Sequence, residues 1–333
     1  MKKLLFLFLV SVQISCTSQG QRKINGVSFV ASRIEVAQEH VEDVMNLNAN
    51  HAAVMPLGFI RDLNSPEIIF DSDKQWYGET KKGVTQYINM LHKNEIGVLL
   101  KPQIWIWKGE FTGNLKMNTE DEWKILEESY SNFIKSYAEV AEETNTEIFC
   151  IGTELEQFVQ NRPEYWKQLI IELRAIYKGK LTYAANWDEY TKTTFWENLD
   201  YIGIDAYFPL SEEMNPTVEE LKAGWKNWKE AIAKLSQEKN KQVLFTEYGY
   251  RSMNYTAKKP WLVDRNQENV NLEAQVNATK VIIEEFWKEN WFAGGYVWKW
   301  FIEHKQSGGN SDNRFTPQNK PAEKTIRELY KIF

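Results

Sequence analysis

Short apolar runs recur along the chain from about residue 24 onward and alternate with longer, charged segments. The runs are rich in Val, Ile, Leu, Phe and Tyr. They are nearly continuous rather than alternating, which is typical of strands buried on both faces of a parallel sheet. The pattern predicts eight strands, at residues 26–31, 52–60, 96–105, 146–155, 180–187, 201–208, 242–248 and 294–301.

Between these runs, apolar residues return with the spacing of a helix face. In residues 121–143, for example, Trp123, Leu126, Tyr130 and Phe133 lie on one stripe. The same spacing predicts helices at residues 35–47, 84–93, 121–143, 165–177, 218–239, 272–288 and 322–332. The link at residues 191–198 is short and has room for two turns at most.

Eight strands that are each followed by a crossover predict an α/β fold, a (β/α)8 barrel formed by one domain at residues 25–333. The alternative is a doubly wound open sheet, but no G-x-G-x-x-G motif follows the first predicted strand. No linker rich in Pro or Gly divides the chain, so a second domain is not expected.

The N-terminus has the pattern of an export signal rather than of a folded element. Lys2 and Lys3 precede an apolar run at residues 4–12, which is too short to span a bilayer. Ser15 directly before Cys16 resembles the cleavage box of a bacterial lipoprotein. We therefore expect a signal peptide at residues 1–15, a tether at 16–24, lipidation of Cys16, and an exported protein anchored to a membrane. An ordinary secretory signal with a chance cysteine is the alternative.

Composition narrows the classes of function. The 333 residues carry a formal net charge of −6, which offers no electrostatic surface for nucleic acid. Only two cysteines occur, and no two of the four histidines have the spacing of metal ligands, so neither a disulfide framework nor a cofactor is expected. The chain is rich in aromatic residues, with 14 Trp, 15 Tyr and 17 Phe, and such rings suit a sugar-binding cleft.

Two glutamates follow predicted strands at places where a charge is costly unless it is used or paired. Glu154 ends the fourth predicted strand and Glu247 ends the seventh. Chemistry in such barrels is built at the carboxyl ends of the strands, so the two carboxylates can face each other across the mouth. Retaining glycoside hydrolysis needs two carboxylates about 5–5.5 Å apart, whereas inversion needs roughly 6.5–9.5 Å. The alternative is that each glutamate pairs with a Lys or Arg at the rim.

Five segments resemble glycoside hydrolase family 113: residues 149–155 (FCIGTEL), 181–187 (LTYAANW), 201–209 (YIGIDAYFP), 244–252 (LFTEYGYRS) and 315–323 (FTPQNKPAE). The resemblance extends from about Gly26 to the C-terminus and implies a barrel whose relatives are chiefly endo-β-1,4-mannanases. It also implies that Glu154 is the acid/base and Glu247 the nucleophile. Residues 100–103 (LKPQ) resemble a motif of the third strand in which His follows Pro, and Gln103 departs from it.

The neighbouring residues have physical roles in this hypothesis. Tyr207 would donate a hydrogen bond to the nucleophile, and Trp298 would form the floor of the subsite for the reacting sugar. Flanking subsites and hydroxyl contacts are expected at Trp105, Trp107, Trp187, Lys101, Asn186 and Asp205. The alternative for the tryptophans is packing between barrel and helices.

These observations predict a retaining glycoside hydrolase of mannan or manno-oligosaccharides, which acts by double displacement. Its partners would be a β-linked oligo- or polysaccharide and, through Cys16, a membrane. Two alternatives stay open: a retaining hydrolase of another β-glycan, and a carbohydrate-binding lipoprotein without catalysis.

Overall fold

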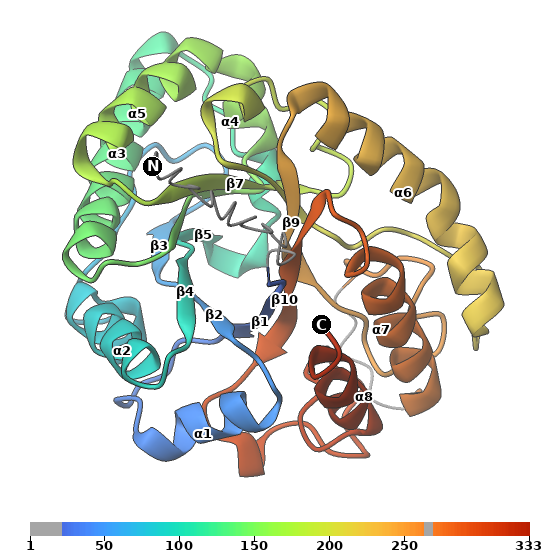
Figure 1. Cartoon of the computed structure of the whole chain (residues 1–333). Helices are drawn as coiled ribbons and strands as arrows, with labels where there is room; N and C mark the ends of the chain where they lie inside the picture. The colour runs from blue at the N-terminus through green and yellow to red at the C-terminus, as the bar shows by residue number, and fades with distance from the viewer. Residues whose placement is uncertain (1–21, 263–268) are drawn as a thin grey trace, which may run out of the picture.

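Eight parallel strands close into a barrel in the computed structural model, which describes residues 22–262 and 269–333 (Figure 1). Around the barrel the strand order is β1-β10-β9-β8-β7-β6-β4-β2, and every neighbouring pair is parallel. The strands are β1 (Ile24–Phe29), β2 (His51–Val54), β4 (Gly97–Leu100), β6 (Ile148–Thr153), β7 (Lys180–Asn186), β8 (Tyr201–Asp205), β9 (Gln242–Tyr248) and β10 (Phe292–Trp300). The predicted (β/α)8 barrel of one domain is confirmed, and the open sheet is excluded.

Helices surround the strands on the outside of the barrel (Figure 1). They are α1 (Gln38–Asn46), α2 (Lys81–Lys93), α3 (Glu120–Glu143), α4 (Glu156–Asn161), α5 (Pro163–Ile176), α6 (Val218–Lys239), α7 (Leu272–Phe286) and α8 (Pro321–Tyr330). Side-chain caps explain four of the starts, those of α2, α3, α6 and α7. The caps are Thr80, Thr119, Thr217 and Asn271, each of which accepts a hydrogen bond from a backbone N–H in the first turn. Between β7 and β8 the short link forms only a turn of 3-10 helix, Trp196–Asn198.

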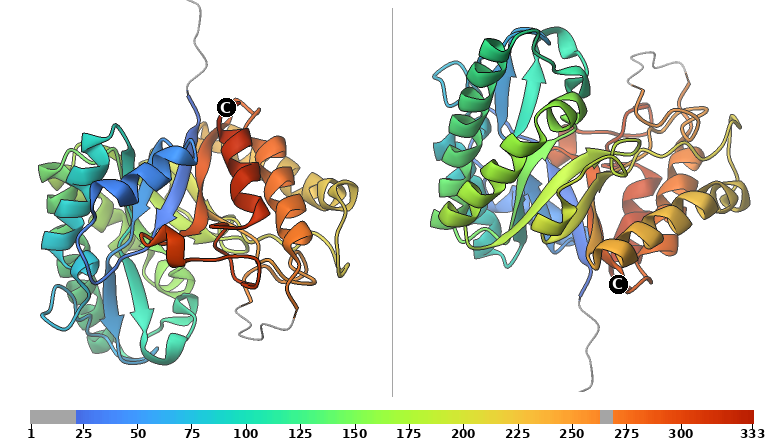
Figure 2. Two further views of the ribbon diagram at one scale, coloured as in Figure 1. Left: turned by 90° about the horizontal axis from the view of Figure 1, so that it is seen from below. Right: turned by 90° about the horizontal axis from the view of Figure 1, so that it is seen from above.

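Two of the predicted strands are wrong in extent. The run at 52–60 divides into β2 and β3 (Leu57–Ile60), and the run at 96–105 divides into β4 and β5 (Gln103–Ile106). Pro56 and Pro102 stand at the breaks, since proline has no N–H for the ladder. β3 and β5 pair with each other as a separate parallel sheet, which extends beyond the carboxyl ends of the barrel strands (Figure 2).

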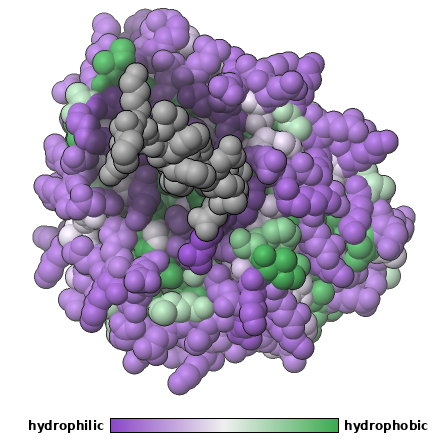
Figure 3. Space-filling view, in the orientation of Figure 1, coloured by the Kyte–Doolittle hydropathy of each residue, from purple (hydrophilic) through white to green (hydrophobic). Residues whose placement is uncertain are grey.

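The apolar residues form two layers. Small and medium side chains fill the barrel interior, among them Ala53, Leu99, Cys150, Ala184 and Leu244. A larger layer lies between strands and helices, and it contains the fully buried Trp166, Trp225 and Trp287. The face of the molecule seen in Figure 3 is mostly hydrophilic, with small hydrophobic patches.

The predicted signal peptide at residues 1–15 and the lipidation site Cys16 lie outside the described residues. Over the part of the chain that the structure does describe, no helix has the length and hydropathy to cross a membrane.

Candidate active site

The two predicted glutamates lie at the carboxyl end of the barrel, one after β6 and one in β9. Glu154 directly follows β6, and its backbone has a left-handed conformation with φ 50°. Its N–H donates to the carbonyl oxygen of Ala184 at 2.8 Å, which ties the end of β6 to β7. The positive φ therefore turns the chain out of the strand at the residue whose side chain carries the charge.

Glu247 is almost fully buried, at 6% exposure, and accepts hydrogen bonds from three side chains. Its Oε1 accepts from Lys101 Nζ at 2.6 Å and from Gln103 Nε2 at 3.0 Å. Its Oε2 accepts from the Tyr207 hydroxyl at 2.7 Å, so the predicted phenol contact is present. Three donors, one from the segment after β8 and two from the β4–β5 segment, fix the orientation of this carboxylate.

Lys101 connects Glu247 to a second carboxylate. Its Nζ lies 3.1 Å from both oxygens of Asp205, and the Thr246 hydroxyl donates to Asp205 Oδ1 at 2.7 Å. Burial would lower the pKa of Lys101, but the charges of Asp205 and Glu247 outweigh burial and raise it. Burial, with the charge of Glu247, raises the pKa of Asp205 to about 7. One ammonium thus compensates two largely buried carboxylates.

This burial corrects one expectation from the sequence. Lys101 and Asp205 are both 0% exposed, so they lie beneath Glu247 rather than at the mouth of the barrel. Bonding sugar hydroxyls does not fit that position. The structure instead gives them the task of holding Glu247.

Glu154 has a different environment from Glu247. It is half-buried, and no lysine or arginine forms an ion pair with it among the described residues. Burial, followed by the negative charges of Asp205 and Glu247, raises the pKa of Glu154 well above its ordinary value. The carboxyl groups of Glu154, Asp205 and Glu247 thus interact electrostatically as one cluster, and the charges of the other two favour the protonated form of Glu154.

A buried pair that the sequence analysis missed supports the segment after β6. The Tyr183 hydroxyl donates to Glu189 Oε1 at 2.6 Å and accepts from the backbone N–H of Leu155 at 2.7 Å. Burial raises the pKa of Glu189 to about 7. The sequence did offer a signal for Glu189. It is an acidic residue just after the predicted strand at residues 180–187, and Glu154 was chosen because it stands at the end of a strand in the same way.

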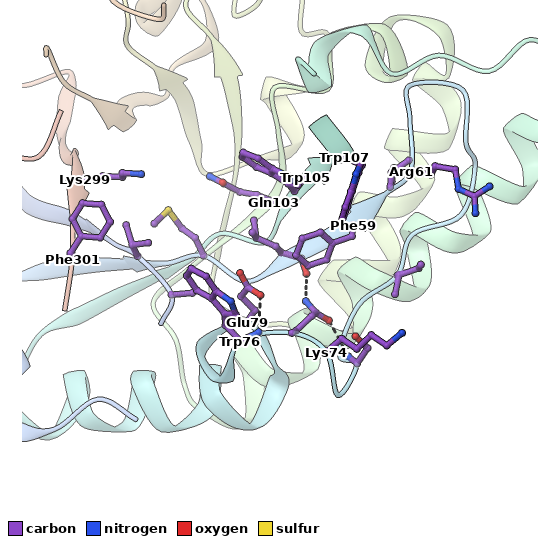
Figure 4. Close-up of a pocket in the computed structure, with 18 of the residues that line it drawn as sticks. Phe59, Arg61, Lys74, Trp76, Glu79, Gln103, Trp105, Trp107, Lys299 and Phe301 are labelled. Atoms are coloured by element: carbon purple, nitrogen blue, oxygen red, sulfur yellow. Dashed lines mark hydrogen bonds between the residues drawn. The ribbon is translucent and has the colours of Figure 1, made fainter. Parts of the chain in front are cut away.

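A cavity of about 900 Å³, shown in Figure 4, reaches Glu247 through Gln103, although neither Glu247 nor Glu154 is among its lining residues. Gln103 and Trp298 line the end of the cavity next to Glu247. The cavity continues over the β3–β5 sheet, where Trp105 and Trp107 are 50% and 66% exposed. Those two rings are available for contact with a ligand rather than used in barrel packing. Trp76 also lines the cavity and was not predicted.

Asn186 and Trp187 do not line this cavity. The Asn186 side-chain amide donates to Asp188 at 3.1 Å. The Trp187 ring stacks on Trp261 with centroids 4.9 Å apart and also contacts Phe208. For Trp187 the structure thus favours the packing alternative over a flanking subsite on the cavity.

Metal ligation has no support from the described residues, among which no three His, Cys, Asp or Glu side chains cluster in a way that could hold an ion. The chemistry of the cluster is that of two carboxyl groups in unlike surroundings: Glu247 accepts three hydrogen bonds, and Glu154 has a pKa raised by burial and by nearby negative charge.

Comparison with solved structures supports the barrel. AaManA, a GH113 β-mannanase from Alicyclobacillus acidocaldarius in complex with ManMIm, has a TM-score of 0.80 and 21% identity, over 93% of this chain and 97% of that chain. A GH113 β-1,4-mannanase in a complex structure has a TM-score of 0.78 and 22% identity, over 93% and 99%. A β-glucuronidase from Faecalibacterium prausnitzii has a TM-score of 0.61 and 16% identity, over 93% and 49%. At these identities the likeness establishes the fold.

The sequence itself establishes the family. Comparison with curated proteins found no match. The sequence profile of Glycoside Hydrolase Family 113, however, matches residues 31–320, which is most of the chain. The chain therefore belongs to Glycoside Hydrolase Family 113, and the protein is a glycoside hydrolase.

Proposed function

We propose that the protein is a retaining endo-β-1,4-mannanase, with Glu247 as nucleophile and Glu154 as acid/base. The observation that carries the proposal is the pair of unlike carboxyl groups: Glu247 accepts three hydrogen bonds, while burial and neighbouring charges raise the pKa of Glu154. The activity named for the solved family members, β-1,4-mannanase, supports mannan as the substrate.

In the first step Glu247 attacks the anomeric carbon, and the bond to the leaving oxygen breaks as Glu154 gives that oxygen its proton. Lys101, Gln103 and Tyr207 hold the attacking carboxylate in one orientation. Once the ester forms, Glu247 has lost its negative charge. One cause of the raised pKa of Glu154 is then gone, and Glu154 can accept a proton from water.

In the second step that water attacks the anomeric carbon and releases Glu247, so the configuration at this carbon is retained. The cavity supplies the binding surface for the sugar chain. Trp298, Trp105 and Trp107 offer flat faces for the C–H faces of pyranose rings. Its volume of about 900 Å³ lies near the upper end for ligand sites, which favours an oligosaccharide over a single sugar.

Two other functions have less support from the structure. A hydrolase of another β-glycan keeps the same mechanism and differs only in which sugars the cavity accepts. A binding lipoprotein without catalysis leaves the buried Lys101, Asp205 and Glu247 cluster without a purpose, although such a cluster is costly to build.

Rescue by azide distinguishes the catalytic roles of Glu247 and Glu154. With 2,4-dinitrophenyl β-mannobioside, Glu247→Ala and Glu154→Ala should each lose activity, by about 10³-fold or more for the nucleophile. Azide should restore Glu247→Ala by direct attack and give an α-glycosyl azide. Azide should restore Glu154→Ala by attack on the glycosyl-enzyme and give a β-glycosyl azide. Product NMR reads the configuration.

The control is Glu230→Ala, because Glu230 is exposed on α6, and this variant should keep full activity. Interchanged azide products would reverse the two roles. Normal rates in Glu247→Ala would remove Glu247 from the mechanism.

The raised pKa of Glu154 predicts the pH profile. A general acid works while protonated, so activity should fall only as pH rises through this raised pKa, well above the ordinary range of a carboxyl group. In Glu154→Ala, assayed with a leaving group that needs no proton, the alkaline limb of kcat/KM should disappear. An alkaline limb that is unchanged in this variant would show that another group is the acid.

We also propose that Cys16 is lipidated and anchors the exported enzyme to a membrane. The support is the apolar run at 4–12 and the small residue before Cys16.

In a bacterial host fed an alkyne fatty acid, the chain should be labelled and should pellet with membranes. Cys16→Ser should lose both properties, while Cys150→Ser should keep them because Cys150 is buried in the barrel. Label retained in Cys16→Ser would refute the anchor.

A further inference from the structure

The charged residues that line the cavity are mostly cations. Arg61, Lys74 and Lys299 contribute three positive side chains, and Glu79 is the acidic residue among the lining side chains (Figure 4). Glu79 is only 7% exposed, accepts the backbone N–H of Trp76, and has a pKa raised by burial. The wall of the cavity is therefore positive, in a chain whose net charge is −6.

These cations have no carboxylate partners within residues 22–262 and 269–333. Ion pairs in this part of the chain join other lysines and arginines to Asp or Glu, but none includes Arg61, Lys74 or Lys299. Arg61 and Lys74 are exposed, so water solvates them. Lys299 is the informative member because it is half-buried.

Lys299 lies at the end of the cavity next to the carboxyl cluster. Its Nζ is 5.5 Å from the ring centroid of Trp298 and 5.0 Å from that of Phe301. Both rings line the cavity, so the ammonium stands between two aromatic faces. Burial lowers the pKa of Lys299, the negative charge of Glu247 opposes that effect, and the positive charge of Arg314 adds to it.

Glu247 does not serve as the partner of Lys299. Its two oxygens already accept from Lys101, Gln103 and Tyr207, and no hydrogen bond joins it to Lys299 among the described residues. A partly buried ammonium without an anion is unfavourable unless something else supplies the negative charge. At a ligand cavity, the ligand is the natural source.

We propose that the sugar chain in this cavity is acidic, and that Lys299 binds the carboxylate of a uronic acid unit in it. The proposal rests on the proposed function, because it takes the cavity as the glycan site of that hydrolase. A uronic acid differs from its parent hexose only at C6, so the β-1,4 backbone and the faces that stack on tryptophan are unchanged. Arg61 and Lys74, in the loop that follows β3, add a positive field for further carboxylates along the chain.

A matched pair of ligands tests this proposal: mannohexaose, and mannohexaose oxidised at C6 to carboxylates. Binding is measured by calorimetry in the Glu154→Gln background, which stops hydrolysis and keeps the charge of Glu247. The oxidised hexaose should bind about tenfold or more tightly than the neutral one, as expected for a charge-assisted hydrogen bond. The preference should shrink as NaCl is raised.

Variants assign the preference to Lys299. Lys299→Met keeps the aliphatic stem and should reduce the ratio of the two dissociation constants to about one. Lys299→Arg keeps the charge and should retain the preference. Lys305→Met is the matched control, because Lys305 is exposed outside the cavity and the preference should be unaffected.

The outcomes separate this proposal from the proposed function. Equal binding of both hexaoses, a preference that survives Lys299→Met, or binding of neither hexaose would overturn the uronic acid proposal. Hydrolysis of neutral mannohexaose by the native chain is measured separately and tests the mannanase assignment. Failure of that assay, with the binding preference intact, would refute the mannanase assignment and leave the acidic ligand.

Discussion

The site depends on one buried interaction, the contact of the Lys101 ammonium with the carboxylates of Asp205 and Glu247. Without the positive charge, two acidic groups in a closed space would repel each other, and at least one would take up a proton. With it, Glu247 has a cationic partner, and its oxygens also accept from Gln103 and Tyr207. The remaining negative charge of the cluster then acts on Glu154 and raises its pKa. A single ammonium thereby gives the two glutamates unlike electrostatic surroundings.

The same cluster accounts for the break between β4 and β5 near this site. Lys101 follows β4, directly before the proline that ends the barrel strand and starts the β3–β5 extension. The break at Pro102 brings Gln103 to Glu247 and carries Trp105 out over the cavity. One irregularity in a strand thus supplies both a donor to the carboxylate and a surface for the ligand.

The fold and the two glutamates were predictable because their signals are local. Buried apolar runs mark strands, and Glu154 and Glu247 come directly after such runs. The roles of Lys101 and Asp205 were not predictable, since they depend on contacts between residues that are far apart in the chain. Lys101 is 104 positions from Asp205 and 146 positions from Glu247. For Trp187 the deciding neighbour is Trp261, on a loop after another strand. The divided strands had a local signal, Pro56 and Pro102, which the continuous apolarity of the runs outweighed.

The central claim is that the carboxylate held by Lys101 forms a covalent bond to the sugar. Trapping with 2-deoxy-2-fluoro-β-mannosyl fluoride, followed by peptide mass spectrometry, tests it most directly, because the fluorine slows release of the intermediate. The account predicts one glycosyl group per chain, attached to Glu247. A label on Glu154 or on another residue, or turnover with inverted configuration and no trapped intermediate, would contradict it.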